Sequence, residues 1–179
     1  MSVLPSVRAT LAERFLFNFR MSPEALSKYV PVSWLVPQVI RGHGVVSFCL
    51  LDLRNITVAP LPTVAGLTSI SCAPRYAVVN TLDAEGKPCV FVTERQTNSA
   101  FGAWFTTLGF SAPHPYVETV IDHQGTRTHL HVHTPGGELL FSAVVDETLE
   151  LNSELFSSTQ NFTDFIAEGI TSGSFGSKP

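Results

Sequence analysis

Three histidines alternate along a predicted strand that reads His-Leu-His-Val-His at positions 129–133. Because alternate residues of a strand share a face, His129, His131, His133 and Arg127 should point the same way. Neighbouring imidazoles, about 6.8 Å apart along the strand, could hold a zinc ion with a third ligand from elsewhere, whereas the outer two, about 13 Å apart, could not share one. No Asp or Glu flanks the trio, so we favour an amphipathic strand over a metal site at His129 and His131.

Charged residues beside apolar strands are the second group that could bind a ligand or take part in catalysis. Arg54 follows one strongly apolar strand and Arg75 opens another, where a charge is usually paired or faces a cavity, so either would suit a carboxylate ligand. Glu94 could act as an acid or base beside the guanidinium of Arg95, or pair with Arg75 across the sheet, the alternative that we favour. The predicted ligand-binding residues are Arg54, Arg75, Tyr76, Glu94, Arg95 and Thr106, and no catalytic residue is assigned.

Composition excludes several classes of function. The 179 residues carry 11 basic and 15 acidic side chains, a net charge of −4, with no block of like charge, which argues against nucleic acid as a partner. The three cysteines form no Cys-x-x-Cys pair, so buried, reduced thiols are expected. No nucleotide-binding fingerprint is present, and we predict no cofactor. The chain shows no secretory signal or apolar spanning segment, so a cytoplasmic location without membrane contact is expected.

The positioning elements follow from periodicity and turn residues. Phe15, Phe17 and Phe19 share one face of a predicted strand over 14–20, and Ser22-Pro23-Glu24 begins a short helix that should run to Tyr29. A long strand is predicted over 43–58, followed by a proline-spaced loop over 59–74 that crosses the domain or contacts another subunit. A hairpin (75–80 and 88–94), a helix (99–109), three strands (116–121, 126–134 and 138–145) and a helix (160–168) complete the prediction.

This tally predicts a largely antiparallel α+β fold. About seven strands and three short helices would form a single domain over 1–179, with a sheet that curls into a barrel. Residues 1–10 and 171–179 are expected to be flexible.

Several short motifs resemble the acetoacetate decarboxylase-like superfamily. In that superfamily a strand ends in an aromatic-Arg pair, a short Ser-Pro-Glu helix begins, and Val-Pro ends it, as at 19–31 here. The layout is similar to that of the uncharacterised bacterial YqjF-like branch. Further motifs occur in the order of that superfamily, namely Arg54-Asn55-Ile56, Arg75-Tyr76-Ala77-Val78-Val79, Glu85-Gly86-Lys87 and Thr106-Thr107-Leu108-Gly109.

The resemblance implies a cone- or barrel-like sheet around a small cavity, often in a homo-oligomer. In the decarboxylases a buried lysine of a Pro-Lys-Lys-Leu-Gly motif forms a Schiff base with the keto acid. Here the corresponding run, Phe105 to Gly109, has Thr where the amine should be, and a hydroxyl cannot form an imine. The acidic partner is replaced by Ala77 or Arg75, and the early arginine falls near Ala12, close to Arg14.

The resemblance therefore excludes a Schiff-base decarboxylase, because none of the three lysines, Lys28, Lys87 and Lys178, is placed to substitute. We favour a domain that binds a small organic acid. The alternative is an enzyme of unknown reaction in the same cavity, with Glu94 as acid or base or with a metal at His129 and His131.

Overall fold

The computed structural model describes residues 7–58, 66–100, 102–103 and 114–168. The chain divides into two compact units. The first unit comprises Met1–Phe15, Cys49–Ala73 and Glu94–Glu147, and the second comprises Leu16–Phe48, Pro74–Thr93 and Thr148–Pro179. Three long strands contribute residues to both units, namely β1 (Val7–Met21), β4 (His43–Val58) and β5 (Leu67–Asn80).

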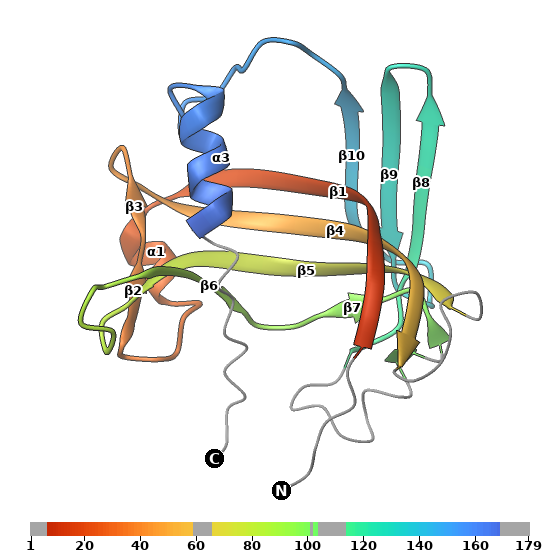
Figure 1. The fold of residues 1–179 in the computed structure, drawn as a ribbon, viewed down its shortest axis with the longest axis horizontal. Helices are drawn as coiled ribbons and strands as arrows, with labels where there is room; N and C mark the ends of the chain where they lie inside the picture. Colours follow the sequence, from red (N-terminus) through yellow and green to blue (C-terminus); the bar gives the residue numbers. More distant parts are fainter. Residues whose placement is uncertain (1–6, 59–65, 101, 104–113, 169–179) are drawn as a thin grey trace, which may run out of the picture. The chain divides into compact units, whose positions relative to one another are not determined.

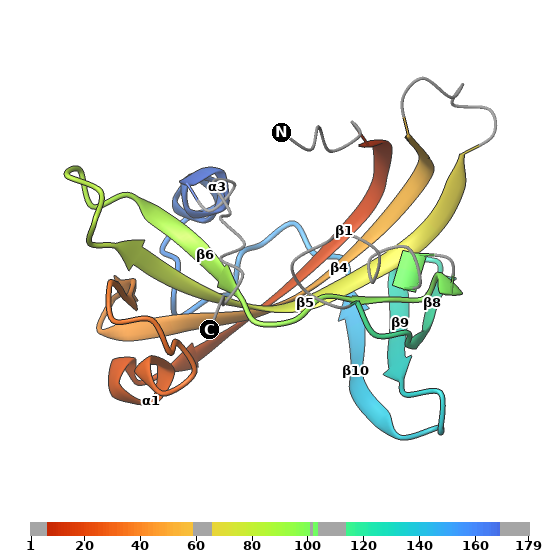
Figure 2. The same cartoon turned by 90° about the horizontal axis from the view of Figure 1, so that it is seen from below.

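The larger sheet has seven strands in the order β1-β4-β5-β2, with β2 at Leu35–Pro37. Three short strands pair beside this path: β3 (Val39–Ile40) with β4, and both β6 (Pro88–Val92) and β7 (Gln96–Thr97) with β5. Figure 2 shows β6 beside β5, antiparallel as the predicted hairpin requires. The prediction of a closed barrel is wrong, because among the described strands β1 pairs only with β4 and nothing joins the two ends of the path.

A separate three-stranded sheet lies in the first unit (Figure 1), with β8 at Glu118–Gln124, β9 at Arg127–His133 and β10 at Leu139–Asp146. Both pairings are antiparallel. Leu130 and Val132 of the central strand are 0% exposed, which confirms that the residues between the histidines face the core. The connections contain Gly125 and Gly137, both with positive φ, as the turn chemistry of the sequence predicts.

Two helices have their bounds within the described residues, where the sequence predicts about three. In α1 (Pro23–Ser27) the Ser22 side chain accepts a hydrogen bond from the Ala25 backbone at 3.2 Å, the predicted N-cap. The helix α3 (Thr159–Glu168) packs through Phe162 and Phe165. The helix expected at 99–109 falls largely outside the described residues. No described helix has the length and apolar character needed to cross a membrane.

Two predicted boundaries are corrected. The strand β5 begins at Leu67, inside the segment predicted to be a loop, because Ser71 and Cys72 pair with β7 and so extend the ladder. The strand β1 begins at Val7, inside the segment expected to be flexible, and Phe19 is 51% exposed instead of sharing a buried face with Phe15 and Phe17.

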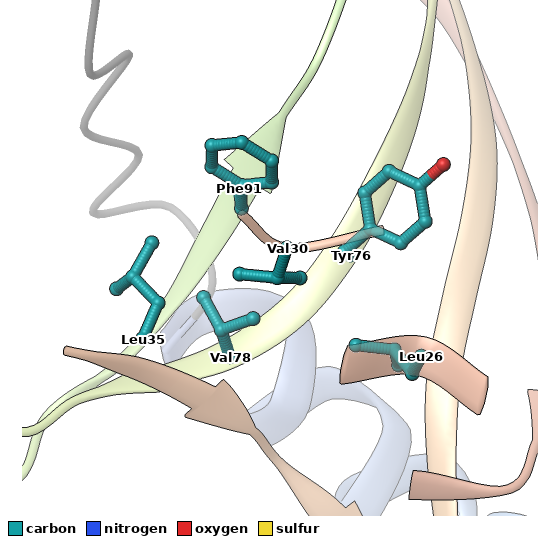
Figure 3. Packing of buried hydrophobic residues seen from close by; sticks show 6 residues of the cluster. All are labelled: Leu26, Val30, Leu35, Tyr76, Val78 and Phe91. Atoms are coloured by element: carbon teal, nitrogen blue, oxygen red, sulfur yellow. The ribbon is translucent and has the colours of Figure 1, made fainter. Parts of the chain in front are cut away.

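Two hydrophobic clusters lie among the described residues of the second unit. Figure 3 shows the first, in which α1, β2 and the β5–β6 hairpin bring together Leu26, Val30, Leu35, Tyr76, Val78 and Phe91. The second cluster consists of Val45, Ala77, Leu155 and Phe156, packed against Ile40, Phe162 and Phe165. Together they anchor both helices to the larger sheet.

Candidate functional site

Asp52 and Arg54 form an ion pair on one face of β4 in the first unit. Nε and Nη2 of Arg54 both donate to Oδ2 of Asp52, at 3.1 and 2.8 Å. The hydrogen bond to Asp52 and its charge raise the pKa of the Arg54 guanidinium. The Asp52 side chain is 10% exposed, against 59% for Arg54. Nη1 of Arg54 makes no hydrogen bond with any described residue, so its N–H groups can donate to a ligand oxygen.

The second carboxylate oxygen of Asp52 is unusual. Oδ1 is buried and has no hydrogen-bond partner among the described residues. An unpaired buried acceptor of this kind costs about 1–3 kcal/mol. Asn55, in the same strand, has a φ of 54°, a left-handed conformation. Such a conformation is typical of a β-bulge, which changes the direction of side chains on the bulged strand.

Glu13 and His123 extend this group, which we call the Asp52 cluster (Glu13, Asp52, Arg54 and His123). Nε2 of His123 lies 3.2 Å from Oε2 of Glu13, and its Nδ1 lies 3.1 Å from Oγ1 of the buried Thr128. The charge of Glu13 also contributes to the raised pKa of Arg54. The cluster therefore places a guanidinium and an imidazole beside two carboxylates, and Arg54 is its group that can donate hydrogen bonds to a carboxylate ligand.

Two other predicted ligand-binding residues also belong to the first unit. Glu94 is exposed, and its Oε1 accepts a hydrogen bond from Nε2 of Gln96 at 3.0 Å. Arg95 is half-buried. Thr106 lies outside the described residues. The role of Glu94 as an acid or base stays a prediction.

Arg75 and Tyr76 belong to the second unit. Arg75 is half-buried on β5. The Tyr76 ring stacks on Tyr29 with centroids 5.8 Å apart and packs against Phe91 at 6.3 Å. Burial raises the pKa of Tyr76, opposed by a hydrogen bond with Thr93, and Figure 3 shows its hydroxyl directed away from the other labelled side chains. Tyr76 thus helps to hold the core together. A ligand site shared by all six predicted residues, and an ion pair between Arg75 and Glu94, stay predictions.

The face of β9 that carries the histidines has acidic neighbours, contrary to the impression from the sequence. Strand pairing places Asp122 opposite His129 and Glu118 opposite His133. Arg127 shares this face, as predicted, and binds Asp146 of β10 through Nε and Nη2 at 2.6 and 3.1 Å. This ion pair lowers the pKa of Asp146.

His131 lies at the centre of the same face. Its ring stacks on His133 with centroids 6.1 Å apart, and its Nδ1 lies 3.2 Å from the hydroxyl of Ser142. Among the residues that the structure describes, no group of three or more His, Cys, Asp or Glu side chains could hold a metal ion. The alternative of a metal enzyme built on His129 and His131 therefore gains no support from this geometry.

The lysines that the structure describes are in solvent. Lys28 is exposed at the C-terminal cap of α1. Lys87 is paired with Glu85 at 2.7 Å, and 61% of its side chain is exposed. Neither amine is buried, as the lysine of a Schiff-base decarboxylase is. Lys178 lies outside the described residues.

A groove of about 400 Å³ lies in the second unit between α3 and the turn that joins β3 to β4. We call it the α3 groove. Ile40, Leu155, Phe156 and Phe165 form its apolar wall. Its polar side chains are Gln38, Arg41, Ser157, Asn161, Asp164 and Glu168. This volume is within the range of small-molecule sites, and the lining is more polar than in most of them.

The α3 groove and Asp52 were missed from the sequence. Gly42, between two short apolar runs, is a turn residue, and it could have placed the neighbouring Arg41 at a turn. Nothing in the sequence associates Arg41 with Asp164, because the two lie far apart along the chain. Asp52 reads as an ordinary charge at the end of a strand, since its burial depends on neighbouring strands.

Known structures with a similar fold were found, although no protein-family model and no curated protein sequence matches this chain. The enduracididine biosynthesis enzyme MppR, complexed with pyruvate, matches with a TM-score of 0.63 and 10% identity over 86% of this chain and 62% of that one. An acetoacetate decarboxylase-like enzyme from Sphingomonas wittichii RW1 matches with a TM-score of 0.63 and 13% identity over 87% of this chain and 63% of that one.

A second MppR complex, with the condensation product of pyruvate and imidazole 4-carboxaldehyde, gives a TM-score of 0.62 and 12% identity over 86% of this chain and 61% of that one. This chain therefore spans less than two thirds of the length of the proteins that it matches. The comparisons confirm the acetoacetate decarboxylase-like fold that the motifs predict.

Proposed function

We propose that this chain, with its acetoacetate decarboxylase-like fold, binds a small carboxylate-bearing molecule without forming a Schiff base. The observation that carries the proposal is the likeness of the fold to that of MppR, which has been captured with pyruvate. Arg54 supports it, because Nη1 makes no hydrogen bond with any described residue while Asp52 holds the other edge in place. A guanidinium positioned in this way favours a carboxylate over a neutral ligand.

The absence of imine chemistry gives the first prediction. Incubation with pyruvate and sodium borohydride should leave the mass of the protein unchanged, because Lys28 and Lys87 are exposed and ordinary lysines react slowly at neutral pH. Intact-mass spectrometry measures this directly. A stoichiometric adduct that maps to one lysine would contradict the proposal, and a Schiff-base decarboxylase run in parallel is the positive control.

Binding itself depends on Arg54. The Arg54→Met substitution should weaken pyruvate binding about 10- to 100-fold, the loss expected for a charge-assisted hydrogen bond of about 1.5–3 kcal/mol. Ligand-detected NMR titration measures the affinity. Arg127→Met is the matched control, because Arg127 is also an arginine paired with an aspartate on a strand, with 55% of its side chain exposed.

Removing Arg54 leaves the charge of Asp52 unpaired, so the fold of the variant must be checked by circular dichroism. If Arg54→Met does not fold, Arg54→Lys keeps the charge but loses the planar edge, and it should still weaken binding. Equal affinities in the wild type and both Arg54 variants would overturn the assignment of Arg54. Equal losses in the Arg54 and Arg127 variants would show a general effect of charge.

A further inference from the structure

The charges of the α3 groove are unmatched and separated. Arg41 makes no ion pair with any described residue. Across the groove, Asp164 and Glu168 have no described cation within 4.0 Å, and Asp164 accepts only a hydrogen bond from the Gln160 amide at 2.8 Å. The groove thus presents a positive group from the β3–β4 turn and negative groups from the helix.

The negative side is reinforced by the helix itself. Asn161, Asp164 and Glu168 lie at i, i+3 and i+7, so they share the face of α3 that lines the groove. Glu168 is the last residue of the helix, where the backbone dipole is negative, and the last turn contains no basic residue. Acidic side chains at this end are unfavourable for the helix alone, and a bound cation would relieve that cost.

The positive side is held by a strained turn. Arg41 and Gly42 have φ values of 50° and 83° and join Ile40 of β3 to His43 of β4, the pattern of a type I′ hairpin. Glycine and asparagine suit both positions, whereas an arginine is disfavoured in the left-handed region. The backbone conformation of this turn therefore does not favour arginine, and the Arg41 that occupies it lines the groove.

We propose that the α3 groove binds a zwitterion, namely a small amino acid with an apolar side chain. Its carboxylate would bind Arg41, and its ammonium group would lie by Asp164 and Glu168 at the end of α3. Ile40, Phe156 and Phe165 would enclose the apolar side chain. The site belongs to the second unit, whereas the Asp52 cluster belongs to the first.

The test uses L-leucine as the probe and amide NMR of the full chain as the readout. Saturable shifts should appear for residues 38–42 and 155–168. Two analogues each carry one of the two charged groups: 4-methylpentanoate has the carboxylate and 3-methylbutylamine has the ammonium group. Each should bind at least about tenfold more weakly, because it leaves one side of the groove unmatched. Binding of either analogue as tight as that of L-leucine would overturn the proposal.

Variants test which side chains of the groove bind each charged group of L-leucine. Arg41→Asn should weaken L-leucine binding about 10- to 100-fold, and Asp164→Asn with Glu168→Gln should do the same. Arg8→Asn removes the same charge from an exposed position of β1 and should leave the affinity unchanged. If Arg41→Asn perturbs the fold, Arg41→Gly, which suits the same turn, replaces it.

Three results would overturn the site: shifts confined to other residues, an Arg41 variant with wild-type affinity, or no saturation by L-leucine or L-phenylalanine up to about 10 mM. The variant Arg54→Met should bind L-leucine like the wild type. Failure of pyruvate binding at Arg54 and failure of L-leucine binding at the α3 groove are therefore separate outcomes.

Discussion

Replacing Gly44 by alanine should lower the free energy of unfolding by about 1–3 kcal/mol, although alanine normally suits a strand better than glycine. Gly44 is buried on β4, and a Cβ placed on it would lie 2.8 Å from Cδ1 of Leu26. Leu26 is 0% exposed and joins α1 to the first hydrophobic cluster. The methyl group can be accommodated only if α1 shifts or Leu26 leaves its position in the core.

A double-mutant cycle tests this cause. Leu26→Ala alone should cost about 2–5 kcal/mol through the cavity it leaves. Added to Gly44→Ala, it should cost less than the sum, because the new methyl group occupies space that the leucine vacated. Urea denaturation followed by tryptophan fluorescence and circular dichroism gives each free energy. Strictly additive costs would contradict the predicted contact.

Gly136→Ala is the control for this cycle. A Cβ on Gly136 would meet only Oγ1 of Thr134 at 3.7 Å, an ordinary contact, so its effect should stay within about 0.5 kcal/mol.

Stability should fall steeply between pH 9 and pH 12 because of one thiol. Cys72 is 1% exposed, and burial, followed by the charges of Cys49 and Glu94, raises its pKa from 9.0 to about 12. Below pH 9 the thiol is neutral in both the folded and unfolded chains, so it has no effect. Above pH 9 only the unfolded chain ionises readily, so stability is lost as the pH rises through the folded pKa.

The free energy of unfolding could fall by up to about 4 kcal/mol, since each unit of pKa shift corresponds to about 1.4 kcal/mol. Urea unfolding at steps from pH 8 to pH 12 measures it, and Cys72→Ala should flatten the profile. Burial also raises the pKa of Cys89, so Cys89→Ala serves as the comparison and should flatten the profile less, because this thiol is only half-buried. An unchanged slope in Cys72→Ala would refute the prediction.

Local signals predicted much of the fold. The strand β4 runs over His43–Val58 as its apolar, β-branched composition indicates, and β5 and β6 form the predicted hairpin. The face of β9 follows from period two alone. These features depend on residues close together in the chain.

Features that depend on distant residues could not be predicted. Strand patterns specify faces but not closure, so the open path of the larger sheet was mistaken for a barrel. Asp122 and Glu118 became neighbours of the histidines only through the register of β8 against β9. For the same reason the α3 groove, which joins a turn near residue 41 to a helix that ends at Glu168, has no local signature.

The division of the chain into two interleaved units limits where a protease, an exon boundary or a recombination event can divide it. The boundaries between the two units fall after Phe15, Phe48, Ala73, Thr93 and Glu147, so the chain alternates between them along its whole length. No continuous fragment consists of one unit alone. A truncation, an exon boundary or a recombination crossover after Phe48, Ala73 or Thr93 would therefore split both, and one after Phe15 or Glu147 would split one of them. We expect the units to be produced and exchanged only together, and a limited proteolytic fragment should not refold as an autonomous half.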